Sequence, residues 1–394
     1  MDEPAHNPRR IAVVTGTRAE FGLLRPVMDA IAARPELELL VLAAGAHLLP
    51  PAETIREVEA AYKIAARIPM QRAGETGRLA DAAALGRGVQ GFAEAFTRLQ
   101  PQVVLVLGDR IEAFAGASAA SVGGIVVAHL HGGDRAEGVA DEAMRHAISK
   151  LAHLHFPATA QSAERLQRLG ENAEHIFQVG SPALDGLAEM PALDEAALAA
   201  LGLSGAGAQP LAVLLHHPAG LPAEVERDTA AHLAGVLLTT IGREQLLALE
   251  PNHDPGREAV LAGLREAGLT KLHPGLPREE FIGLLKRVAA SGGVLAGNSS
   301  AGLIEASAVG CVSLTVGPRQ GGRERGETVI TACETETPTE AALGAALARS
   351  LAHAKETVSG TVSRYGEGRA GRLVAARLEA TPLTPALLRK RNTY

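Results

Sequence analysis

The chain has 394 residues, 46% of them hydrophobic and 21% charged, and a formal net charge of −6. These values exclude a disordered or fibrous protein, and an acidic chain without a long basic run lacks the electrostatic footprint of a nucleic-acid-binding protein. The two cysteines, Cys311 and Cys333, exclude a disulfide framework and a cysteine-based metal cluster, and they suit a reducing compartment. The N-terminus is polar, and no apolar stretch reaches 18 residues, so the sequence predicts a cytoplasmic protein.

Short apolar runs alternate with longer helical patterns along most of the chain. The runs show little alternation between polar and apolar residues, which is typical of parallel strands buried on both faces. We therefore predict two doubly wound, Rossmann-like α/β sheets. The predicted strands are residues 11–15, 39–43, 103–107, 125–129, 155–157 and 176–179, followed by 211–215, 246–249, 294–296 and 312–316.

A stretch of small residues near 191–210 predicts the seam between two domains, residues 1–190 and 191–394. Residues 369–391 read as a helix broken near Pro382 and Pro385 that packs back on the N-terminal domain. Single domains rarely exceed about 250–300 residues, which agrees with two cores. Ligands of open α/β sheets bind beyond the carboxyl ends of the strands, so we expect the active site in the interdomain cleft.

The first predicted strand ends in Thr-Gly-Thr-Arg-Ala-Glu-Phe-Gly, residues 15–22. Gly16 permits a tight turn, and Arg18 opens the next helix as a two-pronged donor suited to a diphosphate. The alternative is a surface arginine near a helix-start glutamate, Glu20.

The strand at 103–107 is followed by Gly-Asp-Arg, which places Asp109 and Arg110 together at a strand end. This pattern predicts a carboxylate and a guanidinium at the cleft. The alternative is that Asp109 is an N-cap residue paired with its neighbours.

Residues 128–146 are the richest in chemistry, with paired glycines that let the backbone approach a ligand closely. Asp141 and Arg145 are four residues apart, so they share one helix face and are alternatively a simple ion pair. The histidines lack a pattern such as H-E-x-x-H, so we predict no metal site. His153 and His155 flank a strand, where we expect structural roles.

Adjacent imidazoles, His216 and His217, end the first strand of the second half. Strand alternation sends their side chains to opposite faces, so only one reaches the cleft. The turn at 251–256, which contains Asn252, either binds a base or is only a loop.

The segment 293–326 reads as a strand, a small-residue turn and a helix over 301–309. Asn298, Ser299 and Ser300 are N-cap types, and a capped helix N-terminus is an anion site. Glu305 lies one turn along, where a carboxylate accepts hydrogen bonds from ribose hydroxyls. Three arginines, Arg319, Arg323 and Arg325, follow the next strand and favour a phosphate ligand.

Six motifs in this order resemble the hydrolysing UDP-N-acetylglucosamine 2-epimerases of sialic-acid-type pathways, over residues 11 to about 375. The motifs are Thr-Gly-Thr-Arg-Ala-Glu-Phe-Gly-Leu-Leu, Gly-Asp-Arg, Arg-His-Ala-Ile-Ser-Lys-Leu at 145–151, His-Pro at 217–218, Gly-Asn-Ser-Ser at 297–300 and Arg-Gln-x-Gly-Arg at 319–323. The resemblance implies a fold of two Rossmann-like domains, the glycosyltransferase-B type, and assembly of the chain into a homodimer or homotetramer.

The resemblance also implies a reaction without metal or other cofactor, in which a base removes the C2 proton while UDP leaves from C1. Water then adds to the 2-acetamidoglucal to give the free 2-epimer, of N-acetylmannosamine type. The acetamido sugar is UDP-N-acetylglucosamine or a diacetamido-trideoxy analogue, with UDP or GDP. The residues implied to hold the nucleotide are Arg18, Arg110, His217, Asn252, Ser299, Ser300, Glu305, Arg319 and Arg323, and those implied to act near C1 and C2 are Asp109, His131, Asp134, Asp141, Arg145 and His217.

Two positions depart from the patterns of the relatives. Many relatives carry a catalytic glutamate in a His-x-Glu-Gly-Gly pattern where this chain has His131, so the base is His131, Asp134 or Glu137. Non-hydrolysing relatives usually have a lysine where this chain has Leu23, which favours the hydrolysing branch over a non-hydrolysing epimerase or a glycosyltransferase of the same fold.

Overall fold

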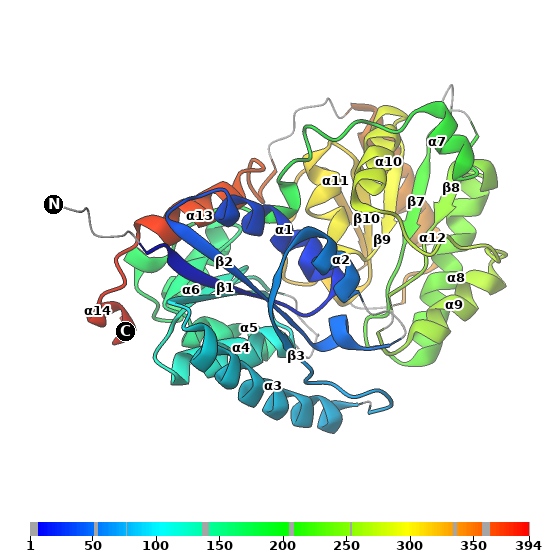
Figure 1. Ribbon diagram of the computed structural model, residues 1–394. Coiled ribbons are helices and arrows are strands. Elements are labelled where there is room, and N and C mark those ends of the chain that lie inside the picture. Colours follow the sequence, from blue (N-terminus) through cyan, green and yellow to red (C-terminus); the bar gives the residue numbers. More distant parts are fainter. Residues whose placement is uncertain are drawn as a thin grey trace. The chain divides into compact units, whose positions relative to one another are not determined.

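Parallel strands with few polar residues build two separate sheets in the computed structural model (Figure 1), which describes residues 7–50, 54–75, 77–135, 142–204, 209–252, 254–333, 337–356 and 363–393. The chain divides into two compact units. The first unit contains residues 1–134, 140–185 and 365–394, and the second contains 135–139 and 186–364. The fold class predicted from the sequence is confirmed: both units are α/β with a wholly parallel sheet.

The first unit has a six-stranded sheet of order β3-β2-β1-β4-β5-β6, the doubly wound order of dinucleotide-binding folds. Its strands are β1 (Arg9–Thr15), β2 (Leu37–Ala44), β3 (Ile64–Ile68), β4 (Val103–Leu107), β5 (Val126–Leu130) and β6 (Leu154–Phe156). Its helices are α1 (Arg18–Ala32), α2 (Ile55–Ala61), α3 (Arg78–Leu99), α4 (Ile111–Val122), α5 (Glu142–Leu151), α6 (Ala160–Arg168), α13 (Ala370–Ala380) and α14 (Pro385–Leu388).

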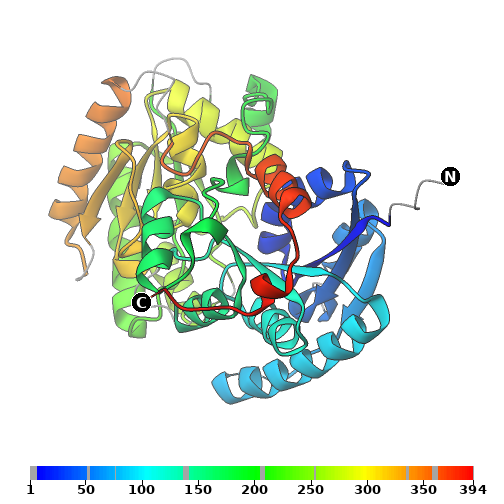
Figure 2. The same cartoon turned by 90° about the vertical axis from the view of Figure 1, so that its left-hand side faces the viewer.

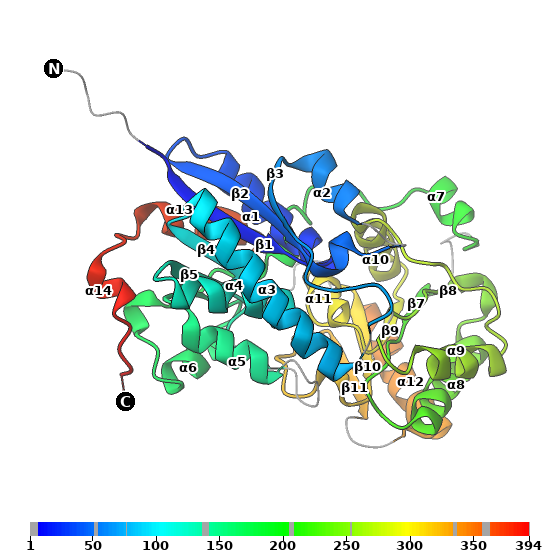
Figure 3. The same ribbon diagram turned by 60° about the horizontal axis from the view of Figure 1, so that its bottom comes forward.

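Alternate residues of β1 and β4 serve two different cores of this unit. Ile11 and Val103 pack with α1 and α13 on one face of the sheet. Ala12 and Val104 pack with α3 and α4 on the other face, where these helices lie side by side in Figure 3. Burial on both faces explains why these strands are continuous apolar runs.

The second unit has a five-stranded sheet of order β11-β10-β9-β7-β8. Its strands are β7 (Ala212–Leu215), β8 (Leu246–Ala248), β9 (Val294–Gly297), β10 (Val312–Val316) and β11 (Val329–Cys333). Its helices are α7 (Glu195–Ala200), α8 (Ala223–Thr240), α9 (Arg257–Glu266), α10 (Arg278–Ala290), α11 (Glu305–Ala308) and α12 (Glu340–Glu356). A core of small and branched residues joins this sheet to α8 and α12.

The C-terminal segment belongs to the first unit, where α13 packs against α1. Asp185 accepts hydrogen bonds from the first backbone N–H groups of α13, those of Ala370 at 2.9 Å and Gly371 at 2.7 Å. The chain then turns at α14, coloured red in Figure 2, and the N–H of Thr393 donates to the carbonyl of Gly170 at 3.0 Å.

Three sequence expectations differ from the structure. Residues 176–179 form no strand, and only Ile176 makes an isolated bridge, to His155. The edge strands β3 and β11 were not predicted. The helix expected over 301–309 is instead a 3₁₀ turn, Ser300–Gly302, followed by the four-residue α11.

No helix in the described part of the chain combines the length and the apolar character needed to cross a membrane.

Candidate functional site

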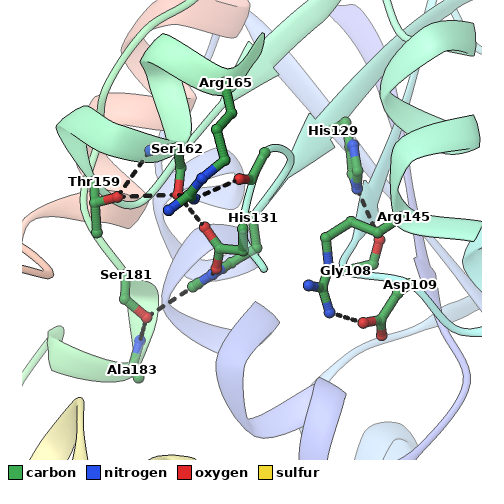
Figure 4. Close-up of polar contacts among 12 residues, drawn as sticks. Gly108, Asp109, His129, His131, Arg145, Thr159, Ser162, Arg165, Ser181 and Ala183 are labelled. Atoms are coloured by element: carbon green, nitrogen blue, oxygen red, sulfur yellow. Dashed lines mark hydrogen bonds and ion pairs between the residues drawn. The ribbon is translucent and has the colours of Figure 1, made fainter. Parts of the chain in front are cut away.

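Asp109 and Arg145 form an ion pair at the carboxyl end of β4 (Figure 4). Gly108, at a φ of +71°, turns the chain out of β4, and Arg145 reaches the carboxylate from α5. The alternative that Asp109 caps α4 is wrong, because Arg110 occupies the N-cap position. Arg145 is only 4% exposed and also contacts Glu142 at 3.1 Å. The structure therefore brings together two residues that the sequence placed 36 positions apart.

His131 follows β5 in the left-handed region of the backbone, with a φ of +61°. Its Nδ1 lies 2.7 Å from Oδ2 of Asp134 and its Nε2 lies 3.1 Å from the hydroxyl of Ser181. The other oxygen of Asp134 accepts from the hydroxyl of Ser162 at 2.7 Å. Because a carboxylate only accepts, the ring donates from Nδ1, and Nε2 holds the lone pair when the imidazole is neutral. The network, shown in Figure 4, fixes both the tautomer and the orientation of His131.

His129, to which the sequence assigned no role, connects the strand ends to α5. Its Nε2 donates to the carbonyl of Gly108 at 2.8 Å, and its Nδ1 lies 3.1 Å from the hydroxyl of Ser149. Burial lowers the pKa of His129 to about 3, so the ring is neutral. The contacts hold the Gly108 turn, and with it Asp109, against the helix that carries Arg145.

Arg18 is the first residue of α1, as predicted, and Thr17 is the N-cap, whose hydroxyl accepts from the N–H of Glu20 at 3.3 Å. The Arg18 side chain is exposed and pairs with Glu57 of α2 at 3.1 Å. Arg110 is also partly exposed, and its Nε lies 3.5 Å from the carboxylate of the fully buried Glu112. Both candidate phosphate ligands thus reach the surface of the first unit.

His217 and Asn298 are joined in the second unit by a reciprocal pair of hydrogen bonds. The N–H of His217 donates to Oδ1 of Asn298, and Nδ2 of Asn298 donates to the carbonyl of His217, both at 2.7 Å. Nδ1 of His217 accepts from the N–H of Asn252 at 3.1 Å. Burial, reinforced by the nearby charge of Arg319, lowers the pKa of His217 to about 3. The ends of β7, β8 and β9 are therefore fastened to one another.

Arg319 follows β10 and lies 3.4 Å from the carbonyl of Asn298, to which Gln320 donates at 2.8 Å. It forms an ion pair with Asp254 at 3.8 Å, and burial lowers the pKa of the guanidinium. Arg323 is half-buried, and its Nε has no hydrogen-bond partner among the described residues. Both arginines thus lie near the end of β10, Arg319 with a long ion pair to Asp254.

The serine turn after β9 differs from the predicted long helix. The hydroxyl of Ser299 accepts from the N–H of Ala301 at 3.3 Å and so caps only the 3₁₀ turn that begins at Ser300. Glu305 is the first residue of α11. A cavity of about 330 Å³ in the same unit is bordered by Asn298, Gly317 and the buried His216, at the ends of β9, β10 and β7.

The structure groups the predicted site residues into two sets, one in each unit. Asp109, His131, Asp134 and Arg145, with Arg18 and Arg110, lie at strand ends of the first unit, while His217, Asn252, Ser299, Ser300, Glu305, Arg319 and Arg323 lie in the second. Asp141 and Glu137 are outside the described residues. His155, for which we expected a structural role, contacts the buried Glu171 at 3.0 Å. The described residues include no group of His, Cys, Asp and Glu that could hold a metal ion.

Comparison with known proteins identifies the family. The profile of the UDP-N-acetylglucosamine 2-epimerase family matches residues 29–379. The chain is 35% identical to the hydrolysing UDP-N,N'-diacetylbacillosamine 2-epimerase of Legionella pneumophila, over 98% of this chain and 100% of that enzyme. It is 32% identical to the UDP-N-acetylglucosamine 2-epimerase of Neisseria meningitidis serogroup B, over 82% of this chain and 83% of the relative.

A solved structure shows the same fold. The crystal structure of UDP-GlcNAc 2-epimerase from Neisseria meningitidis bound to UDP-GlcNAc superimposes with a TM-score of 0.74 at 16% identity, covering 94% of this chain and 99% of that one. Fold, family profile and full-length identity agree, and the chain belongs to the UDP-N-acetylglucosamine 2-epimerase family.

Proposed function

We propose that this enzyme is a hydrolysing 2-epimerase, which converts a UDP-2-acetamido sugar into the free 2-epimer and UDP. The chain is 35% identical, over 98% of its length, to a relative whose name specifies hydrolysis. This similarity supports the hydrolysing reaction over epimerisation of the intact nucleotide-sugar. Leu23 adds to this support, because it packs against the apolar core of the first unit where non-hydrolysing relatives usually carry a lysine.

The observation that carries the proposal is the pairing of Asp109 with Arg145 at the end of β4. Arg145 is almost fully buried, so its charge requires a carboxylate partner, and this partner is held at a fixed place on the rim of the sheet. A carboxylate fixed in this way suits proton transfer at C2 or protonation of the departing group at C1. We assign Asp109 this chemistry and Arg145 the task of orienting it.

In the first step a base takes the C2 proton, the C1–O bond breaks, and UDP leaves with the bonding electrons as a C1=C2 double bond forms. In the second step the oxygen of water bonds to C1 and a proton returns to C2 on the opposite face. His131 suits one of these transfers, because Asp134 holds the proton on Nδ1 and leaves the lone pair on Nε2. Asp141 stays a candidate from its position in the sequence.

The diphosphate that leaves carries the charge that develops in the first step. Arg319 and Arg323 suit its stabilisation, since both follow the strand beside the Ser299 turn and the ion pair of Arg319 with Asp254 is long, at 3.8 Å. Arg18 and Arg110 of the first unit supply further positive charge at exposed positions. We assign Glu305 to the ribose hydroxyls, and Ser299 and Ser300 to the phosphates.

Proton NMR of the purified enzyme in D₂O, without added metal, tests the reaction. UDP-N-acetylglucosamine and UDP-N,N'-diacetylbacillosamine are supplied separately. We expect release of UDP and a free 2-epimer that carries deuterium at C2 from one of the two sugars. An intact UDP-sugar epimerised at C2 would assign the non-hydrolysing reaction, and transfer to an acceptor without C2 exchange would assign a glycosyltransferase.

Calorimetric titration with UDP tests the nucleotide site in the second unit. Arg319→Ala and Ser300→Ala should each weaken UDP binding about tenfold, the loss of one charge-assisted contact of about 1.4 kcal/mol. Arg243→Ala is the matched control, since that arginine is on the surface of the same unit and bonds the carbonyl of Gly268. Unchanged affinity in both site variants would move the phosphate site elsewhere.

A further inference from the structure

The C-terminal segment of the chain supplies an ammonium group to the end of the helix that carries Arg145. Lys390 lies 240 positions after Lys150, and its Nζ donates to three carbonyls at the end of α5, those of Ser149 at 3.0 Å, Lys150 at 2.7 Å and Ala152 at 2.6 Å. The last carbonyls of a helix lack partners inside it, and a cation there also meets the negative end of the helix dipole. Lys390 therefore closes the C-terminal end of α5.

A buried carboxylate fixes Lys390 in this place. Glu171 is 2% exposed, and its Oε2 lies 2.5 Å from Nζ of Lys390 and 3.0 Å from Nε2 of His155. Burial alone would raise the pKa of Glu171, but hydrogen bonds from His155, Lys150 and Lys390 lower it to about 2, so the group is ionised. An ammonium group has three N–H donors, and four oxygen atoms surround this one, so all of its donors are used.

Other contacts hold the backbone on both sides of Lys390. Leu387 of α14 is 5% exposed and belongs to a core of the first unit. After Lys390, the N–H of Thr393 donates to the carbonyl of Gly170 at 3.0 Å. The segment thus has anchors besides the ammonium group, and a variant without that group should keep the segment attached.

The end of α5 that Lys390 closes is connected by hydrogen bonds to the turn that presents Asp109. The hydroxyl of Ser149 lies 3.1 Å from Nδ1 of His129, and Nε2 of His129 donates to the carbonyl of Gly108 at 2.8 Å (Figure 4). Gly108 immediately precedes Asp109 in the chain. A continuous path therefore leads from the ammonium group to the residue that we assign to proton transfer.

The same helix reaches Asp109 a second time, through Arg145, which lies one turn before Ser149 and pairs with the carboxylate. The packing beside Ser149 is close, because a Cβ on Gly132 would lie 3.0 Å from its hydroxyl and 2.8 Å from Nδ1 of His129. A displacement of α5 therefore changes both the ion pair of Asp109 and the turn that presents it.

We propose that Lys390 is a positioning residue, which holds the end of α5 so that Ser149 and Arg145 keep Asp109 in its place. This inference rests on the proposed function, because it takes Asp109 as a group that transfers a proton. Lys390 acts through α5 and not on the substrate. It is expected to affect the chemical step more than the binding of the nucleotide.

Lys390→Met tests this role, because methionine keeps an unbranched apolar side chain and removes the three donors. We expect kcat per folded enzyme to fall about tenfold, since a small displacement of a catalytic group has effects of this order or larger. KM and the dissociation constant of UDP should stay within about threefold of the wild type, a split that a loss of stability alone would not produce. Lys390→Gln, which keeps two N–H donors, replaces this variant if the methionine variant does not fold.

Lys150→Met is the matched control, because it removes the same charge from the same carboxylate. Lys150 contacts Oε1 of Glu171 at 2.8 Å, and it also holds the C-terminal segment through Oδ1 of Asn392 at 2.8 Å. This variant should lower stability but keep kcat within about twofold of the wild type. Equal losses of kcat in the two variants, or a kcat of Lys390→Met within twofold of the wild type, would overturn the proposal.

A double-mutant cycle tests the path through the helix. Ser149→Ala keeps the carbonyl that Lys390 binds and removes the hydroxyl that contacts His129. If both residues act through the same helix end, the double variant should lose clearly less kcat than the product of the two single losses. A loss equal to that product would show that Lys390 acts independently of Ser149 and would overturn the proposal.

Hydrogen exchange of the free protein separates this inference from the proposed function, because it needs no substrate. The backbone N–H groups of α5 should exchange about tenfold faster in Lys390→Met than in the wild type, since the helix end is no longer held. Unchanged exchange would overturn the inference even in an active enzyme. Faster exchange in a protein that converts neither sugar would contradict the proposed function and leave the support of α5 by Lys390 in place.

Discussion

The two units use the same arrangement, parallel strands that end in polar turns, but they stabilise the polar groups differently. In the first unit polar and charged side chains are paired with each other, as in Asp109 with Arg145 and His131 with Asp134. In the second unit Asn298 bonds the backbone of a neighbouring strand end, and Arg319 is held beside it with a long ion pair to Asp254, at 3.8 Å. The first unit therefore presents fixed charges suited to proton transfer, and the second presents a fixed backbone with available positive charge suited to an anion.

The largest effect is expected where the first unit loses its buried charge pair. Asp109→Asn should lower kcat about 10³-fold, since it removes a proton-transfer group and leaves Arg145 beside a neutral amide. UDP binding, measured by calorimetry, should stay within threefold of the wild type. Asp228→Asn, an exposed aspartate paired with Arg227, is the control. A variant with near-normal kcat would show that Asp109 has no catalytic role.

Strands that are buried on both faces were predictable from the sequence. The strands that the sequence did not predict are partly exposed. The predicted bounds of β4 and β10 are confirmed, because strands covered on both faces are uninterrupted apolar runs. β3 and β11 are edge strands whose residues are partly exposed, and Arg67 interrupts the apolar pattern of β3. A half-exposed edge strand has no periodic signal strong enough to separate it from a loop.

The shortened helix after β9 follows a turn that packs against the neighbouring strand, a contact that local sequence does not reveal. The hydroxyl of Ser313 on β10 donates to the carbonyl of Gly302 at 2.8 Å, and a Cβ on Gly302 would lie only 3.2 Å from that serine. This packing of the turn against β10 accompanies the change from a 3₁₀ turn to the short α11. Capping residues indicate where a helix begins but not how far it runs.

In the candidate site, too, the sequence motifs identified residues, whereas contacts between residues far apart in the sequence came from the structure. Motifs placed Asp109 and Arg145 near strand ends, but their pairing depends on which helix returns to which strand. His131 contacts Ser181, fifty positions away. No local pattern encodes such contacts, so the sequence identified the chemical groups but not their partners.

In the second unit the reciprocal hydrogen bonds of Asn298 are the feature to break. Asn298→Ala removes a buried amide and leaves the N–H and carbonyl of the half-buried His217 without side-chain partners, which should lower the free energy of unfolding by about 1–3 kcal/mol. UDP affinity should fall several-fold, because Arg319 also contacts this turn. Urea unfolding and calorimetry measure the two effects. Asn172→Ala, which removes an exposed cap in the first unit, should have a much smaller effect, and equal effects would show that the turn is not a fastening point.

Stability at low pH tests the comparison of the two units further, because burial keeps histidines neutral in both. The pKa of His129 is lowered to about 3, below its unfolded value, so the unfolded chain binds the proton first and stability is lost as pH falls below about 6.5. His129→Gln should remove up to about 1.4 kcal/mol of this loss per pH unit. Urea unfolding from pH 7 to 4 measures the slope, with His353→Gln, a half-exposed histidine of α12, as the control. Equal slopes for the wild type and His129→Gln would contradict the assignment of a neutral, buried ring.

The smallest effect is expected at the exposed ion pair of Arg18 with Glu57 in the first unit. We assign the positive charge of Arg18 to binding of the nucleotide. Glu57→Gln should change the free energy of unfolding by less than about 1 kcal/mol, because solvent screens an exposed pair. It should also strengthen UDP binding two- to threefold at low salt, since Arg18 no longer shares its charge with a carboxylate, and this gain should vanish at high salt. Glu59→Gln on the same helix removes a similar pair, with Arg67, and should leave UDP affinity unchanged. If both variants leave affinity unchanged at low salt, Arg18 does not contact the diphosphate, and the available positive charge belongs to the second unit alone.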